Sequence, residues 1–105
     1  MAVQEVEVAF DKTGIGTSQV VKGTGVTKIV VLKFFTYCNG ANDVTWQDSD
    51  GMILMPVMSF GAKQGFVFDK DADRTPWIIV APGKDLMLKL SAATQVVGKL
   101  WYWQG

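Results

Sequence analysis

The stretch from Lys28 to Tyr37 reads KIVVLKFFTY, and it decides the fold class. Successive side chains of a β-strand point to opposite faces of a sheet, and here both sets are apolar. The residues expected on one face are Ile29, Val31, Phe35 and Tyr37, and those on the other are Val30, Leu32 and Phe34. A strand that is apolar on both faces is predicted to be central, with a second sheet over one face and a partner over the other.

Strand signals recur along the rest of the chain, and helix signals are nearly absent. A turn at Cys38 to Gly40 and the alternation of residues 43–47 predict a β-hairpin with the central strand. Residues 86–90 and 96–103 alternate on either side of a turn at 91–94 and predict a second hairpin. Roughly eight short strands at this spacing predict an all-β protein, an antiparallel β-sandwich of the jelly-roll kind.

The N-terminal region has its own pattern. Val6, Val8 and Phe10 alternate with polar or small residues, which predicts an amphipathic strand, and a glycine-rich stretch follows. We expect residues 1–25 to form an N-terminal arm or first strands, and residues 26–105 to form the sandwich of a single domain. Glu5 and Glu7 share one strand face and are expected to solubilise a sheet edge.

The composition favours a protein that makes contacts with other subunits. It is 49% hydrophobic and only 19% charged, which in so small a domain predicts burial against neighbouring subunits. Ten basic and ten acidic residues cancel without forming a Lys/Arg cluster, so the attraction that dominates nucleic-acid binding has no source. The longest apolar runs, residues 29–32 and 52–58, fall short of the roughly 20 residues that span a bilayer. Self-association is expected, with neither nucleic acid nor membrane as a partner.

The residues that usually carry chemistry are scarce. The chain has no histidine, which removes the usual general base and the commonest transition-metal ligand. We therefore expect no enzyme and no cofactor. Asp69, Asp71 and Asp73 alternate as in a calcium loop, but Arg74 and Val80 stand where an EF-hand needs glycine and glutamate. A solvated loop is the preferred interpretation of these acids, with a calcium site as the weaker one.

The single cysteine and the N-terminus bear on the compartment. Cys38 has no partner for an internal disulfide, which fits a reducing compartment, and it is expected to be a small buried hydrophobe. Residues 1–7 contain two acids where an export signal needs basic residues followed by an apolar run. No export signal is therefore expected, and synthesis in a cytoplasm is.

The four tryptophans divide into two pairs. Trp46 and Trp77 are expected in the core. Trp101 and Trp103 differ, because Leu100 and Tyr102 on the opposite face of the same strand also need cover, and one face alone can meet the domain's own core. We predict an interface with sister subunits that is formed by Phe35, Tyr37, Trp101 and Trp103.

Several segments resemble small structural proteins of tailed bacteriophages. They are Lys28 to Leu32, Gly40 to Trp46, Met55-Pro56 and Ala81 to Gly98, so that the resemblance covers roughly residues 26–103. It consists of strands and turns rather than a catalytic motif. The resemblance implies a jelly-roll-like sandwich, often trimeric, that decorates or cements a capsid or belongs to another head- or tail-associated part of the virion.

These expectations combine into one leading hypothesis. The chain is expected to be made in the cytoplasm of a bacterial host and to bind the major capsid protein on the virion surface as a homotrimer. The segment with Val6, Val8 and Phe10 would attach it by adding a strand to a neighbour's sheet. The alternatives are a tail- or fibre-associated virion protein, and a carbohydrate-binding module that uses exposed aromatic residues.

Overall fold

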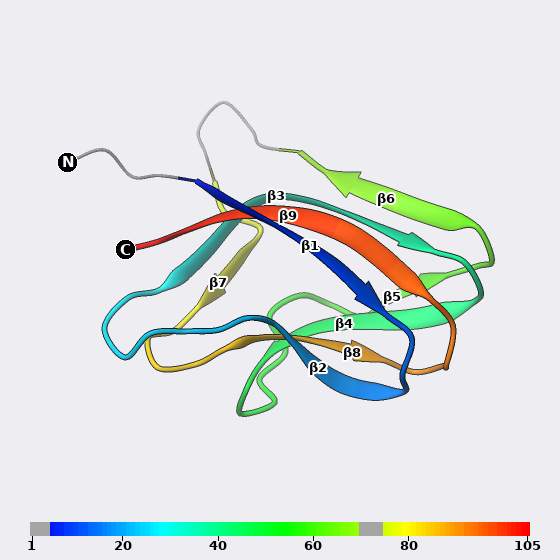
Figure 1. The fold of residues 1–105 in the computed structure, drawn as a ribbon, viewed down its shortest axis with the longest axis horizontal. Coiled ribbons are helices and arrows are strands. Elements are labelled where there is room, and N and C mark those ends of the chain that lie inside the picture. Colours follow the sequence, from blue (N-terminus) through cyan, green and yellow to red (C-terminus); the bar gives the residue numbers. More distant parts are fainter. Residues whose placement is uncertain (1–4, 70–74) are drawn as a thin grey trace.

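A computed structural model of the chain describes residues 5–69 and 75–105. These residues form nine antiparallel strands in two packed sheets and no helix, which confirms the predicted all-β sandwich (Figure 1). The strands are β1 Val6–Lys12, β2 Gly16–Val21, β3 Ile29–Cys38, β4 Asn42–Asp48, β5 Met58–Phe60, β6 Gln64–Phe68, β7 Ile78–Val80, β8 Leu86–Leu90 and β9 Val96–Gln104.

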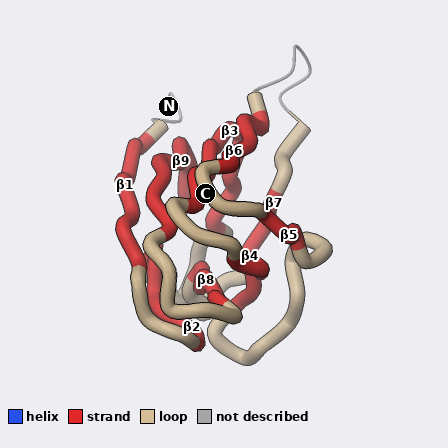
Figure 2. The backbone as a smooth tube through the Cα atoms, turned by 90° about the vertical axis from the view of Figure 1, so that its right-hand side faces the viewer, coloured by secondary structure: helices blue, strands red, loops and turns tan. Residues whose placement is uncertain are grey.

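The strands are divided between two layers, seen from the end in Figure 2. The first, which we call sheet A, has the order β1-β9-β3-β6, and β7 also pairs with β3. The second, sheet B, has the order β2-β8-β4-β5. β6 pairs with residues 34–38 of β3, and β7 pairs with residues 29–31 of β3. These two short strands therefore lie one after the other along the same edge of β3.

The two predicted hairpins were wrong in one respect. β3 lies in sheet A and β4 in sheet B, and β8 lies in sheet B and β9 in sheet A, so each turn carries the chain from one sheet to the other. Apolar–polar alternation in a sequence predicts a strand, and turn residues predict that the chain reverses direction. Neither signal shows whether the second strand pairs with the first or packs above it in the other sheet. The buried leucines of β8 and Leu100 of β9 meet across the core instead.

β3 is the central strand of sheet A, between β9 on one side and β6 and β7 on the other. Its predicted faces are wrong at one end, because a β-bulge shifts the register with β9 between Val31 and Lys33. The extra residue moves Ile29 and Val31 onto the same inner face as Phe34 and Cys38. Phe35 and Tyr37 remain on the other, outer face.

Residues 6–21 are part of the sandwich and do not form a separate arm. β1 pairs with β9 from Val6 to Lys12, and β2 pairs with β8. Phe10 is 5% exposed and its ring lies 5.4 Å from that of Trp46, edge to face. Val8 packs against the same core. The domain's own core thus uses Val8 and Phe10, while the predicted attachment of this strand to a neighbour's sheet stays a prediction.

The core lies between the two sheets and consists of the inward-facing residues of both. Trp46 is its largest fully buried side chain, with Phe34 edge to face at 5.6 Å. The leucines of β8 and Leu100 of β9 are also fully buried. Burial of large apolar side chains at about 2 kcal/mol each is the main stabilisation of such a domain. Because the inner faces are thus occupied, any contact with another molecule must use an outer face or an edge.

Candidate functional site: the outer face of sheet A

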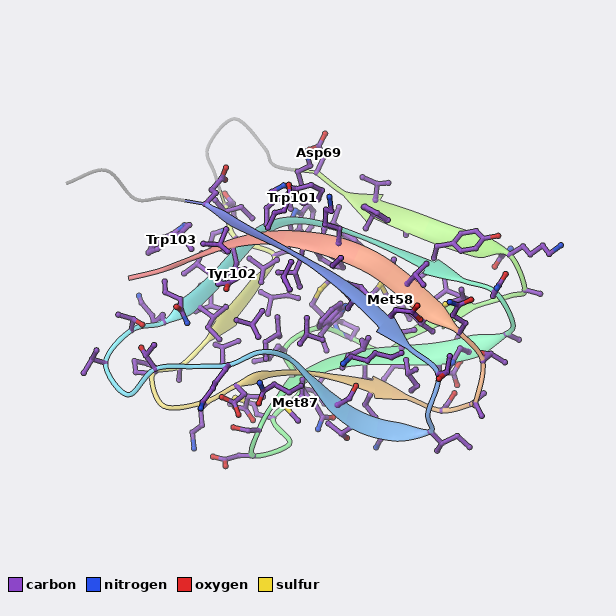
Figure 3. The ribbon with its side chains drawn as sticks, in the orientation of Figure 1. Met58, Asp69, Met87, Trp101, Tyr102 and Trp103 are labelled. Atoms are coloured by element: carbon purple, nitrogen blue, oxygen red, sulfur yellow. The ribbon has the colours of Figure 1, made fainter. Side chains whose placement is uncertain are left out.

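The outer face of sheet A brings together the four residues that the sequence predicted as an interface. The register pairs Phe35 with Lys99, Lys33 with Trp101 and Val30 with Trp103, and paired residues share a face. Tyr37 follows Phe35 on that face. We call these four residues, Tyr37, Phe35, Trp101 and Trp103, the aromatic band. Figure 3 shows Trp101 on the far side of β9 from sheet B, with Tyr102 on the side facing it.

Charged side chains surround Trp101 at the centre of the aromatic band. The Lys33 ammonium lies 4.5 Å from the centre of the indole ring, and that of Lys99 lies 5.7 Å from it. The indole Nε1 donates a hydrogen bond of 2.9 Å to the Glu7 carboxylate. Phe35 is 6.5 Å away, ring centre to ring centre. Lysine stems cover apolar surface while their ammonium groups stay in water, so the chain itself partly shields Trp101.

Glu7 connects β1 to this cluster. Its carboxylate accepts a hydrogen bond of 3.1 Å from the Lys99 ammonium and the bond from Trp101 on its other oxygen. The hydrogen bond from Lys99, followed by that from Trp101, holds the pKa of Glu7 below its ordinary value of 4.5. Glu7 is therefore ionised at neutral pH and fixes the orientation of the Trp101 ring, rather than merely solubilising an edge as we predicted.

The sequence reasoning missed Lys33, Lys99 and Glu7 as members of this site. Their position was not readable in advance, because it depends on β1 pairing with β9 and β9 with β3. The residue row that joins them is Glu7, Trp101 and Lys33, one from each strand. The period-two pattern placed each residue on a face of its strand, but the pairing of strands far apart in sequence placed the three faces side by side.

The margins of the aromatic band are apolar and open to solvent. Tyr37 is 37% exposed, and next to the band Ile79 on β7 is 49% and Val67 on β6 is 64% exposed. Trp103 is half-buried and its ring lies against Gly105, where an added Cβ would come within 2.5 Å of it. Large apolar side chains that gather on one face of a small domain mark a contact surface more often than scattered ones do.

The outer face of sheet B is different in character. Its residues are mostly polar: Thr17 and Gln19 on β2, Thr45 and Gln47 on β4, and Met87 and Lys89 on β8. Met87 is the large apolar residue among these strand positions, and Figure 3 shows it on the side of β8 that faces away from sheet A. Ile53, which is 59% exposed, extends the same row through a bridge to Gln47. A polar outer face is typical of a sheet that is solvated on one side. The protein therefore has one outer face that is mostly polar and one that is aromatic.

The two tryptophans predicted for the core have different environments. Trp46 is fully buried, as predicted. Trp77 is 41% exposed, so that prediction was wrong. Its ring packs edge to face against Phe68 at 5.1 Å, and its Nε1 donates a hydrogen bond of 2.9 Å to the main-chain oxygen of Asp69. Trp77 directly precedes β7, at the margin of the sheet.

The other candidate residues give no second site. Asp69 is described, whereas Asp71 and Asp73 lie outside the described residues, so the calcium hypothesis stays a prediction. Among residues 5–69 and 75–105, no three His, Cys, Asp or Glu side chains are grouped so that they could hold a metal ion. Cys38 is fully buried, as predicted, and burial raises the pKa of its thiol above the ordinary value. No helix in the described part of the chain could cross a membrane.

Comparisons with known proteins add no relative. No family model, no curated protein and no solved structure matches this chain significantly. Functional inference therefore depends on the geometry of the chain itself, above all on the contrast between its two outer faces.

Proposed function

We propose that this protein is a non-enzymatic structural subunit that works by contact with other protein subunits through the outer face of sheet A. The observation that carries the proposal is the contrast between the two outer faces. Four aromatic residues of β3 and β9 lie together on sheet A, while the outer face of sheet B is mostly polar and has no aromatic residue at its paired positions in the described strands. A protein with a single aromatic face suits a fixed place in an assembly, with one side covered and the other in water.

Within that class, the most specific proposal is a decoration or cement protein on the capsid of a tailed bacteriophage, made in the bacterial host. The sequence resemblance to small virion proteins favours it. The strand orders of the two sheets also fit a jelly roll, because all connections except β4 to β5 and β6 to β7 pass between the sheets. Its partners would be the major capsid protein and two further copies of itself, and a tail- or fibre-associated position is the alternative within the virion.

The carbohydrate-binding alternative has less support from the aromatic band. Sugars stack on an open aromatic face. At Trp101, however, the Lys33 ammonium lies over the ring, and the indole nitrogen is already bonded to Glu7. A protein partner could move the flexible lysine heads aside and still use the lysine stems as apolar surface. The environment of Trp101 therefore favours a protein contact over a sugar.

Sedimentation velocity of the purified chain tests the self-association. We expect an assembly of at least three 11.5 kDa chains at micromolar concentration. Trp103→Gln should lower the mass of the assembly, because the substitution removes an aromatic ring from the band. Met87→Gln is the matched control on the polar face of sheet B, and it should leave the mass unchanged. A wild-type chain that stays monomeric, or equal effects of the two variants, would contradict the role of the aromatic band.

Electron microscopy of the virion tests the location. We expect density of this size on the outer shell, with the aromatic band against neighbouring subunits and sheet B toward solvent. Density at the tail would replace the capsid proposal by the tail alternative. A virion without such density would refute both virion roles.

A further inference from the structure

The two sheets have five edges among the described residues, formed by β1, β6 and β7 in sheet A and by β2 and β5 in sheet B. An edge strand offers unpaired main-chain groups to other chains, and soluble proteins protect such edges with charges, bulges or short length. β1 carries Glu7, Asp11 and Lys12. The register of β2 is broken between Gln19 and Val21. β5 and β7 have three residues each.

β6 has none of these protections. It is five residues long, has the sequence QGFVF, and pairs with β3 in an unbroken register. Phe66 is 58% exposed on the inner face and Val67 is 64% exposed on the outer face. Beside it lies an open groove of about 520 Å³, lined by Phe66, Phe60, Ser59, Gln64 and Gly65. β6 therefore presents an unprotected strand edge together with apolar side chains on both of its faces.

The charges that flank β6 indicate what covers it. Lys63 and Asp69 are the nearest charged residues, each three positions from Phe66 and opposite in sign. Two β6 strands that run antiparallel about a two-fold axis at Phe66 bring Lys63 of each copy close to Asp69 of the other. A parallel pair would bring like charges together instead. The charge pattern is thus complementary to itself in one orientation only.

We infer that β6 pairs antiparallel with β6 of a second copy of this chain, centred on Phe66, so that two sheets A join into one. A two-fold contact of this kind closes on itself and leaves no further edge of the same type. The edges formed by β1, β2, β5 and β7 are poorer partners for β6, because charge, a bulge or short length interrupts their pairing. The inference goes beyond the proposed function and does not depend on a capsid.

The side chains of β6 fit this arrangement. The two Phe66 rings meet above the groove, and Val67 of each copy lies opposite Gly65 of the other. Gly65 has no space for a side chain, because an added Cβ would lie 2.7 Å from the main-chain oxygen of Thr36 on β3. The missing side chain leaves room for Val67. Since the outer faces of both sheets A then point the same way, the two aromatic bands form one larger surface.

Disulfide cross-linking tests the pairing directly. Cα atoms directly opposite in an antiparallel pair lie about 4.5 to 5.5 Å apart, within reach of a disulfide. Phe66→Cys should therefore cross-link two copies under mild oxidation, in at least about tenfold higher yield than a matched variant. That control is Gln19→Cys, at an exposed position of edge strand β2 on the outer face of sheet B, away from the aromatic band. Native Cys38 is buried and should not react. Equal yields for the two variants, or no dimer with Phe66→Cys, would overturn the inference.

A charge reversal tests the orientation. Lys63→Glu should weaken the pairing about tenfold, because it places two like-charged pairs at the ends of the contact. The double variant Lys63→Glu with Asp69→Lys should restore the pairing. Each effect is measured as the dissociation constant of the β6 contact, with Trp103→Gln also present in every variant. Failure of the double variant to recover would overturn the antiparallel pairing. Cross-linking through Phe66→Cys should persist with Trp103→Gln, so loss of the aromatic-band contact and loss of the β6 contact are separable.

Discussion

Gly98 lies where sheet A is most tightly packed, and its replacement by alanine is a sharp test of the fold. It stands in the middle of a row across three strands, opposite Phe10 on β1 and Thr36 on β3. An added Cβ would lie 2.1 Å from the main-chain oxygen of Phe35 and 2.5 Å from Cζ of Phe10. The first of these atoms belongs to the backbone of β3, so β9 would have to move away from β3 to make room.

Two opposing effects decide the expected change in the free energy of unfolding. Replacing a strand glycine by alanine restricts the unfolded chain and gains roughly 0.5 to 1 kcal/mol. Forcing an extra carbon into a packed core loses about 1 to 3 kcal/mol, and here the clash is with both a backbone atom and the buried Phe10 ring. We therefore expect Gly98→Ala to destabilise the domain by about 2 kcal/mol, a large share of a typical stability of roughly 5 to 15 kcal/mol.

Urea unfolding followed by tryptophan fluorescence measures this change. With an m-value of about 1 to 1.5 kcal/mol/M, the midpoint should fall by roughly 1.3 to 2 M. Gly14→Ala is the matched control, because an added Cβ there has no atom within 4 Å and its φ is not in the left-handed region. It should be neutral or slightly stabilising. Gly98→Ala with a midpoint within 0.3 M of the unsubstituted chain at equal protein concentration would refute the close packing of β1, β9 and β3.

Two further predictions concern single side chains. The Glu7 carboxylate accepts hydrogen bonds from Lys99 and Trp101, and these bonds lower its pKa. They therefore stabilise the folded state above the unfolded pKa, and this stabilisation is lost as pH falls through the lower, folded pKa. The indole N–H resonance of Trp101 should titrate with a midpoint below 4.5, and a midpoint at or above that value would contradict the contact. The thiol of Cys38 is buried and has a raised pKa. It should therefore react with a thiol reagent only as the chain unfolds in urea. Rapid reaction of the folded protein would show that the C-terminal end of β3 is open to solvent.

The sequence predicted which residues form strands better than it predicted how the strands meet. The alternation of β8 and β9 and the burial of Trp46 were readable, because period two and hydrophobicity are local properties. The passage from β3 in sheet A to β4 in sheet B was not, because the same turn residues serve either connection. The inner position of Ile29 was missed for a related reason, since the bulge after Val31 arises in the pairing with β9 and has no sign in β3 alone.

The sequence predicted the four residues of the aromatic band but not their environment. An apolar face on β9 was evident from Trp101 and Trp103, and we expected both to need cover by a partner. The structure supplies part of that cover from Lys33, Lys99 and Glu7, which come from three different strands. Strand order decides which charged side chains reach an aromatic ring, and no single stretch of the sequence contains that information.

The lysines around Trp101 bear on how the aromatic band would behave before and after the proposed contact with another subunit. A cation–π contact at an exposed site contributes roughly 0.5 to 1 kcal/mol, so a partner can displace the ammonium of Lys33 at small cost. Burial of the indole that it uncovers contributes more, at about 25 cal/mol for each Å² of apolar surface. Glu7 keeps the ring in place through its hydrogen bond, so the ring needs no reordering on contact. In the proposed assembly, shielding by the lysines and orientation by the Glu7 carboxylate would let the aromatic band stay in water until a neighbouring subunit covers it.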